Sequence, residues 1–151
     1  MKLAEPVLVS MCLLGINCRY NQTSKRNSKV IEAIKGKVVV PICPEALSGL
    51  ACPRAPAEID RGDGFSVLAG KAKVLSKDGK DWTKQFIFGA REALRLARLL
   101  EVKSAILKDR SPSCGVNYVY NQGKLVKGVG IFTALLIKEK VVILCEKDFE
   151  D

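Results

Sequence analysis

The sequence predicts one α/β domain, residues 1–151, in which a mainly parallel sheet carries helices on both faces. Short runs of branched apolar residues alternate along the chain with amphipathic helical patterns, which is typical of strands joined by crossover helices. The first of these runs is too continuous for a one-sided sheet, which indicates a strand buried on both faces. A chain of 151 residues that is 48% apolar and 27% charged has the size and balance of one globular domain.

The amino-terminal half contains two predicted strands and one short helix. The elements are, in order, a buried strand at 6–11, a loop at 12–25, a helix capped by Asn27 or Ser28 and running through Ile34, and a strand at 37–42. The next segment, 43–56, contains three prolines, so no regular structure is expected there.

The carboxyl-terminal half is centred on one long predicted helix, residues 82–100, with Asp81 as its cap. Trp82, Phe86 and Ala93 recur on one face at helical spacing, which indicates a stripe of core residues. The other expected elements are extended pieces at 58–60 and 72–75 that pair as a hairpin, a strand at 104–107, strands at 118–120 and 125–126 around a turn at 121–123, a helix at 131–139 and a last strand at 141–145.

The chain contains six cysteines and no histidine. The lack of histidine excludes nucleophiles activated by imidazole and histidine-ligated zinc hydrolases. The amino terminus lacks the apolar core of a signal peptide, and no apolar run approaches a membrane span, so we expect a cytoplasmic protein with reduced thiols and no membrane partner. In such a protein the cysteines indicate metal ligation or burial rather than disulfides.

The net charge of +9 has two interpretations. It favours an anionic partner such as a nucleotide or RNA, and it equally fits a lysine-rich surface that keeps the protein in solution. The basic residues are spread along the chain, so no RNA-binding tail is recognisable. Both a monomer and a homodimer are compatible with the sequence.

Three cysteines follow apolar strand-like runs at or near their ends, next to glycine or proline: Cys12, Cys43 and Cys114. Because ligands of open α/β sheets sit outside the carboxyl ends of the strands, these thiols are candidates to meet at one metal centre. Three thiolates are one short of the usual shell of an iron–sulfur cluster, which leaves an iron free for chemistry. The alternative is three buried core thiols.

The other three cysteines have less distinctive positions. Cys18 lies six residues after Cys12 and is interpreted as a nearby non-ligand, with a fourth ligand or a resolving thiol as alternatives. Cys52 lies in a loop and is ambiguous. Cys145 lies in an apolar run and is interpreted as a core strand residue.

Several polar residues near the three cysteines are candidates for catalysis or binding. Glu45, two residues after Cys43, is a candidate acid–base group if it is partly desolvated, or else a charge in the first turn of a helix or a loop cap. Ser111 and Ser113 are candidates to contact substrate or cluster, or to cap their turn. The candidate anion-binding residues are Arg19 with Tyr20, Arg54, and Lys108 with Arg110.

Several of these segments together resemble the thiouracil desulfidase family. They are Ser10-Met11-Cys12-Leu13-Leu14-Gly15, Cys18-Arg19-Tyr20, Pro41-Ile42-Cys43-Pro44-Glu45, Pro53-Arg54-Ala55-Pro56 and Ser111-Pro112-Ser113-Cys114-Gly115. The resemblance extends over nearly the whole chain. It implies a Rossmann-like fold and a [4Fe-4S] cluster on Cys12, Cys43 and Cys114, with one open iron that takes the sulfur of the substrate.

The resemblance also implies the reaction. Thiolated uracil or its nucleotide, such as 4-thiouracil, 2-thiouracil or 4-thiouridine monophosphate, would exchange its sulfur for the oxygen of water and release hydrogen sulfide. Glu45 would be the acid–base residue, and Ser113 or Ser111 a substrate contact. The chain departs from the family pattern at Asn21-Gln22, where relatives usually carry Asp-Gly, and at Cys52 and Ala55, where they often carry Thr and Pro.

Two other classes of protein remain compatible with the residues. One is a non-catalytic metal-binding or cluster-binding module in which Cys18 joins the three cysteines in a closed four-thiolate site. The other is an accessory protein that binds thiolated tRNA, for which steep salt dependence without turnover is the expected behaviour.

Overall fold

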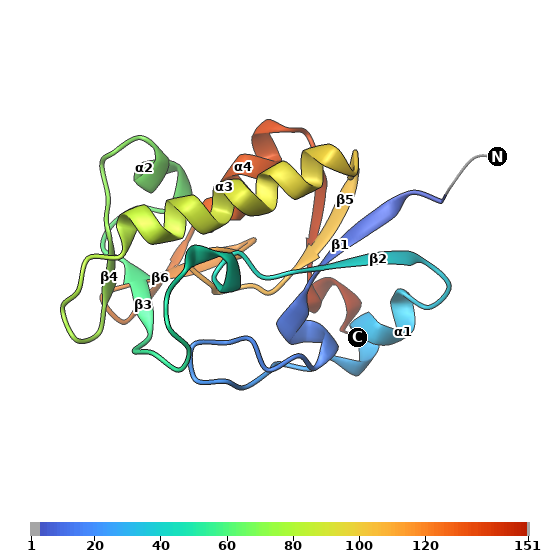
Figure 1. Ribbon diagram of the computed structural model, residues 1–151, viewed down its shortest axis with the longest axis horizontal. Helices are drawn as coiled ribbons and strands as arrows, with labels where there is room; N and C mark the ends of the chain where they lie inside the picture. Colours follow the sequence, from blue (N-terminus) through green and yellow to red (C-terminus); the bar gives the residue numbers. More distant parts are fainter. Residues whose placement is uncertain (1–3, 151) are drawn as a thin grey trace.

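A four-stranded parallel sheet forms the centre of the computed structural model, which describes residues 4–150 (Figure 1). Its strands are β1 (Pro6–Ser10), β2 (Val38–Ile42), β5 (Ser104–Leu107) and β8 (Val142–Cys145), and they lie in the order β2-β1-β5-β8. Every pairing in this sheet is parallel, which confirms the predicted α/β, Rossmann-like class.

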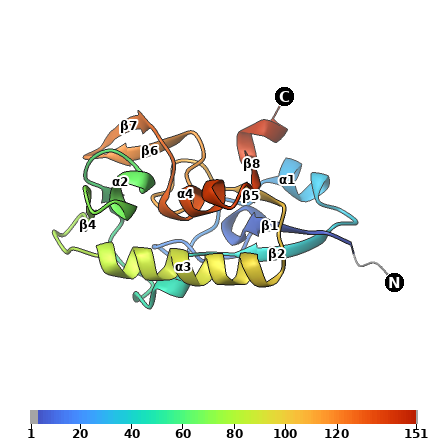
Figure 2. The ribbon, with the colours of Figure 1, turned by 90° about the horizontal axis from the view of Figure 1, so that it is seen from above.

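Helices cover both faces of the sheet, as the sequence predicted (Figures 1 and 2). On one face α3 (Thr83–Leu99) and α4 (Ile131–Lys138) pack over Leu8 and Leu107. On the other face α1 (Ser28–Ala33) and the carboxyl-terminal 3₁₀ turn η3 (Glu146–Phe149) pack near Val9. Successive residues of a strand point to opposite faces, so β1 has to be apolar at nearly every position.

The edge position of β2 explains how a proline stands inside a strand. Pro41 pairs with Val9 of β1, yet it has no N–H to donate. Because β2 has a neighbour on one side only, the missing donor does not interrupt a second ladder.

Two small antiparallel sheets lie beside the central one. β3 (Ala57–Ile59) pairs with β4 (Val74–Ser76), as expected, but they do not form a tight hairpin, because the helix α2 (Gly64–Leu68) lies between them. The sequence analysis missed α2, which begins at an Asp63–Ser66 capping box. β6 (Tyr118–Asn121) and β7 (Lys124–Lys127) form the predicted hairpin.

Short 3₁₀ turns are the other elements that the sequence analysis missed. η1 (Met11–Leu14) directly follows β1, and η3 directly follows β8. The expectation of no regular structure in segment 43–56 was wrong, because η2 (Ala46–Ser48) forms there. The prolines stand near the two ends of that segment and leave room for one turn between them.

The cap of α1 is the predicted residue, whereas the formal cap of α3 lies one residue after the predicted one. The Asn27 side chain accepts the N–H of Val30 at 3.0 Å and caps α1. Asp81 accepts the N–H of Thr83 at 3.0 Å, although Trp82 occupies the formal cap position of α3. Within residues 4–150, no helix has both the length and the apolar character needed to cross a membrane.

Candidate functional site

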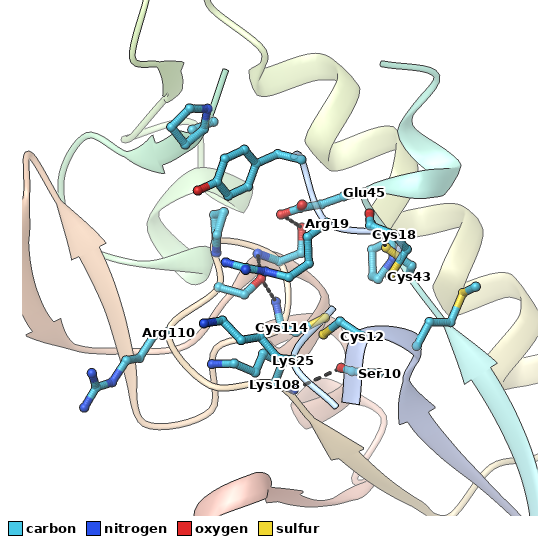
Figure 3. A pocket seen from close by; sticks show the side chains of 18 of the residues that line it. Ser10, Cys12, Cys18, Arg19, Lys25, Cys43, Glu45, Lys108, Arg110 and Cys114 are labelled. Carbon is cyan, nitrogen blue, oxygen red and sulfur yellow. Dashed lines mark hydrogen bonds between the residues drawn. The ribbon is translucent and has the colours of Figure 1, made fainter. Parts of the chain in front are cut away.

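The three predicted cysteines come together because they leave three neighbouring strands. Cys12 lies in η1 after β1, Cys43 directly follows β2, and Cys114 lies in the loop after β5. Since β1 lies between β2 and β5 and all three run the same way, their carboxyl ends meet at one edge of the sheet. All three thiols line the same cleft of about 420 Å³ (Figure 3).

That cleft also contains nearly every other polar residue singled out from the sequence. The sequence-predicted residues that line it are Arg19, Tyr20, Glu45, Arg54, Lys108, Arg110, Ser111 and Ser113. Cys18 lines it as well, whereas Cys52 and Cys145 do not. Cys145 is fully buried in β8, as expected.

The thiols are buried close to one another, and this strongly disfavours their anionic forms. Burial, and then the neighbouring Cys43, raise the pKa of Cys12 to about 11. Burial, and then Cys43 and Cys12, raise the pKa of Cys114 well above its usual range. A hydrogen bond with the Cys18 thiol, together with burial, raises the pKa of Cys43. Such thiols become thiolates only with a compensating positive charge, which a bound metal centre supplies.

The donor chemistry of the thiols suits an iron–sulfur cluster, whose usual protein ligands are cysteine thiolates. Within residues 4–150, no three Cys, Asp or Glu side chains are grouped so that they could hold one metal ion. Four-cysteine zinc sites place all their sulfurs around one point. A cluster of several irons and sulfides is larger, and it takes soft thiolate donors of the kind that line this cleft.

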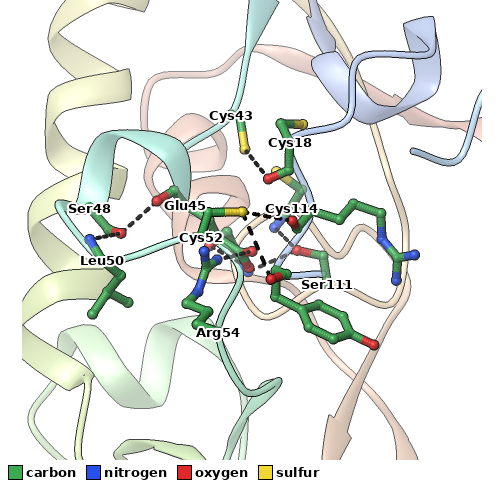
Figure 4. Close-up of polar contacts among 12 residues, drawn as sticks. Cys18, Cys43, Glu45, Ser48, Leu50, Cys52, Arg54, Ser111 and Cys114 are labelled. Carbon is green, nitrogen blue, oxygen red and sulfur yellow. Dashed lines mark hydrogen bonds and ion pairs between the residues drawn. The ribbon is translucent and has the colours of Figure 1, made fainter. Parts of the chain in front are cut away.

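Glu45 is a largely buried carboxylate of the cleft, and Arg54 holds it (Figure 4). The Arg54 guanidinium donates to Glu45 Oε2 at 3.0 Å, and their side chains are only 6% and 17% exposed. On the other oxygen, Ser113 Oγ donates to Glu45 Oε1 at 3.5 Å. Burial raises the pKa of Glu45 above its usual value, although Arg54 and Ser113 oppose the shift. Glu45 is therefore a group that can hold a proton beside the thiols.

The loop that carries Cys114 is shaped by Ser111 and by a close contact with α4. Ser111 Oγ accepts the N–H groups of Ser113 and Cys114, both at 3.1 Å, so this hydroxyl caps the turn. A Cβ on Gly130 would lie 2.3 Å from the carbonyl carbon of Ser113, so only glycine allows α4 to begin against this loop.

Asp109 anchors the same loop through one carboxylate oxygen. Its Oδ1 atom accepts four backbone N–H groups at 2.9–3.1 Å, from Arg110, Val116, Asn117 and Tyr118. The chain on both sides of Cys114 is thus gathered around a single buried acceptor.

Glu146 ties the carboxyl-terminal turn η3 to this loop. Its Oε1 atom accepts the N–H of Asp109 at 2.7 Å. Its other oxygen, Oε2, lies 2.9 Å from Lys108 Nζ. Two neighbouring residues of the loop after β5 are therefore held by one carboxylate of η3, which links the end of the chain to the cleft.

The loop that carries Cys43 and Glu45 is held by α3. A Cβ on Gly89 would lie 2.1 Å from the carbonyl oxygen of Pro44, so the helix touches this loop through its bare backbone. Ser48 closes the loop, because its hydroxyl donates to the Glu45 carbonyl at 2.5 Å and accepts the N–H of Leu50 at 3.2 Å. The helix predicted as core thus also sets the position of the acid–base candidate.

The basic side chains of the cleft differ in how they are engaged. Arg54 and Lys108 are ion-paired with Glu45 and Glu146. Arg19 lies over the ring of Tyr20, 5.4 Å from its centroid, and donates to Thr23 Oγ1 at 3.3 Å. Figure 3 shows the basic ends of Arg19 and Lys25 on the same side of the cleft, whereas Arg110 points further away from the thiols.

Sequence reasoning did not single out several residues that line this cleft, among them Lys25, Asp109 and Ser10. Lys25 carried no signal, because it stands in an ordinary polar loop, and only its N–H bond to the Cys12 carbonyl, at 2.9 Å, brings it to the cleft. Asp109 carried a weak signal, since it is a charged residue two positions after a buried strand. Ser10 is buried at the end of β1, where its Oγ accepts the N–H of Lys108 at 3.0 Å.

The fold and site define an α/β protein with a parallel sheet, whose carboxyl edge carries a cleft lined by cysteine thiols and by the carboxylates of Glu45 and Asp109. The chain belongs to the 2-thiouracil desulfurase family, whose model matches residues 7–148.

Two individual relatives agree with this assignment. The uncharacterized protein YbbK of Bacillus subtilis (strain 168) is 39% identical over 148 residues, which are 96% of this chain and 98% of that protein. The solved structure of the [4Fe-4S]-dependent thiouracil desulfidase TudS is 35% identical, with a TM-score of 0.81 over 95% of this chain and 92% of that one.

Proposed function

We propose that this protein is an iron–sulfur desulfidase that removes sulfur from thiolated uracil or its nucleotide and yields uracil or its monophosphate with hydrogen sulfide. Cys12, Cys43 and Cys114 would hold a [4Fe-4S] cluster and leave one iron without a protein ligand. The observation that carries the proposal is the meeting of the buried thiols of Cys12 and Cys114, the half-buried thiol of Cys43 and the largely buried carboxylate of Glu45 in one cleft. When bound, the cluster would supply a soft Lewis acid for the sulfur of the substrate.

Glu45 is the proposed acid–base residue. Burial raises its pKa, which favours the protonated carboxyl and would allow it to exchange a proton with water or a ring nitrogen in the cleft. Arg54 fixes one carboxylate oxygen and leaves the other facing Ser113. Ser113 is the proposed substrate contact, and Ser111 acts by shaping the turn that presents Ser113 and Cys114.

The cleft also supports a proposal for the rest of the substrate. A volume of about 420 Å³ lies within the usual range of small-molecule sites and accommodates a nucleotide. Tyr20 offers a ring for contact with the base or sugar, and Arg19 offers positive charge for a phosphate. Lys108 is paired with Glu146, so we propose that it holds the floor of the cleft and adds only part of its charge to substrate binding.

Anaerobic reconstitution with iron and sulfide tests the proposed function. We expect about four irons per chain, the number in the proposed cluster. We also expect hydrogen sulfide release from 4-thiouracil, 2-thiouracil or 4-thiouridine monophosphate that is lost in Cys114→Ala. A protein that takes up zinc through four cysteines and shows no turnover would contradict the proposal. Salt-dependent binding of thiolated tRNA without turnover would instead favour the accessory role.

Cys18 separates an open site from a closed one. If the cluster is held by three cysteines, Cys18→Ser keeps its iron while Cys12→Ser loses it. Equal loss of iron in both variants would indicate a closed four-thiolate site.

A further inference from the structure

Two surface loops at the mouth of the cleft exchange hydrogen bonds with each other. The thiol of Cys52 donates to the carbonyl of Arg19 at 3.2 Å and approaches that of Tyr20 at 3.8 Å (Figure 4). In return, Gln22 Nε2 donates to the carbonyl of Cys52 at 3.4 Å. The N–H of Arg54 donates to the Tyr20 carbonyl at 2.8 Å and completes the contact.

The backbone at Gln22 shows that this contact has a conformational cost. Gln22 has a φ of +58°, in the left-handed region that favours glycine. A side chain in this conformation has to be held by its surroundings, and here its amide reaches across to Cys52.

We infer that Gln22 and Cys52 form a clasp that fixes the loop of Arg19 and Tyr20 and so sets the affinity for substrate; this inference rests on the proposed function. Neither clasp residue lines the cleft, so both are positioning residues. Arg54 transmits the effect, because its backbone binds Tyr20 while its side chain binds Glu45. The clasp therefore fixes the position of the Arg19–Tyr20 loop relative to Glu45, the proposed acid–base residue.

Paired substitutions in the full chain, reconstituted anaerobically with iron and sulfide, test the clasp. Cys52→Ala removes the thiol, and Gln22→Gly removes the amide without adding backbone strain. Cys52→Ser restores a donor to the same carbonyls. Gln122→Gly is the matched control, because Gln122 also has a positive φ, of +48°, and donates to the Asp60 carbonyl outside the cleft.

Substrate affinity and amide exchange provide two independent measurements. For Cys52→Ala and Gln22→Gly we expect KM to rise roughly 2- to 10-fold with kcat unchanged, the effect of losing one hydrogen bond. The amide of Arg54 should exchange with deuterium faster by a similar factor. Cys52→Ser should restore both quantities, and Gln122→Gly should change neither.

A failure of the clasp and a failure of the proposed function would give different results. Wild-type amide exchange at Arg54 in both clasp variants, or equal effects from Gln122→Gly, would overturn the clasp. If the wild-type protein turns over no thiolated pyrimidine, the proposed function fails, and the exchange of the Arg54 amide still decides whether the clasp exists.

Discussion

Replacement of Asp109 by alanine is expected to destabilise the fold by about 4 kcal/mol, because four backbone N–H groups lose their shared acceptor. Asp109 is 1% exposed, so little water replaces the carboxylate. A hydrogen bond to a charged group contributes about 1.5–3 kcal/mol alone. Four bonds to one oxygen add less than four times that value, because the four N–H groups share a single acceptor and their contributions are not independent. Asp109→Asn keeps an acceptor oxygen and should lose about half as much.

Urea unfolding of the reduced, cluster-free chain at neutral pH measures this loss without any contribution from bound iron. Asp81→Ala is the comparison variant, since Asp81 accepts only groups of Thr83 at an exposed helix end and should lose about 1 kcal/mol. An Asp109→Ala variant no less stable than Asp81→Ala would show that this carboxylate does not hold the Cys114 loop.

The same carboxylate predicts a dependence on pH. Burial alone would raise the pKa of Asp109, but hydrogen bonds from Asn117, Tyr118, Val116 and Arg110 outweigh it and lower the pKa below its ordinary value of 3.8. The stabilisation is therefore complete well above pH 3.8 and is lost as the pH falls through the folded-state pKa. The difference in free energy of unfolding between wild type and Asp109→Asn should shrink as the pH falls below 3.8. A difference that stays constant with pH would contradict this account.

Three further predictions concern the cleft. Glu45→Gln should lower turnover about 10²- to 10⁴-fold while the iron content stays at the wild-type value, and unchanged turnover would exclude Glu45 as the acid–base residue. Gly89→Ala should lower the iron bound after reconstitution, because the new methyl group meets the Pro44 carbonyl, whereas Arg91→Ala on the exposed side of the same helix should not. Lys25→Ala should raise KM for 4-thiouridine monophosphate and leave KM for free 4-thiouracil unchanged; equal changes for both would place Lys25 away from the phosphate.

Local patterns were enough to predict the main elements. The four strands of the central sheet, α3 and α4 were expected close to their observed bounds, because apolar periodicity is a property of neighbouring residues. The Asn27 cap of α1 was predicted for the same reason. The helix α2 was missed because its five residues lie among glycines that indicate a loop.

The sequence predicted many of the residues that line the cleft, but not the ion pairs among them. Cysteines after apolar runs, together with the rule that ligands sit beyond strand ends, placed the three thiols at one edge of the sheet before the strand order was known. The sequence could not show that Arg54 holds Glu45 or that Lys108 pairs with Glu146, because each partner lies on a different loop or turn.

The class of fold, the family and the residue types of the site follow from the order of amino acids alone. They depend on periodicity, composition and motifs, which can be read along the chain. Which thiols share one cleft, which cations are already paired and how Gln22 meets Cys52 become known only in the folded molecule. Burial and electrostatic interaction depend on distances in space, and those distances exist only once the parallel strands have brought remote loops to one edge.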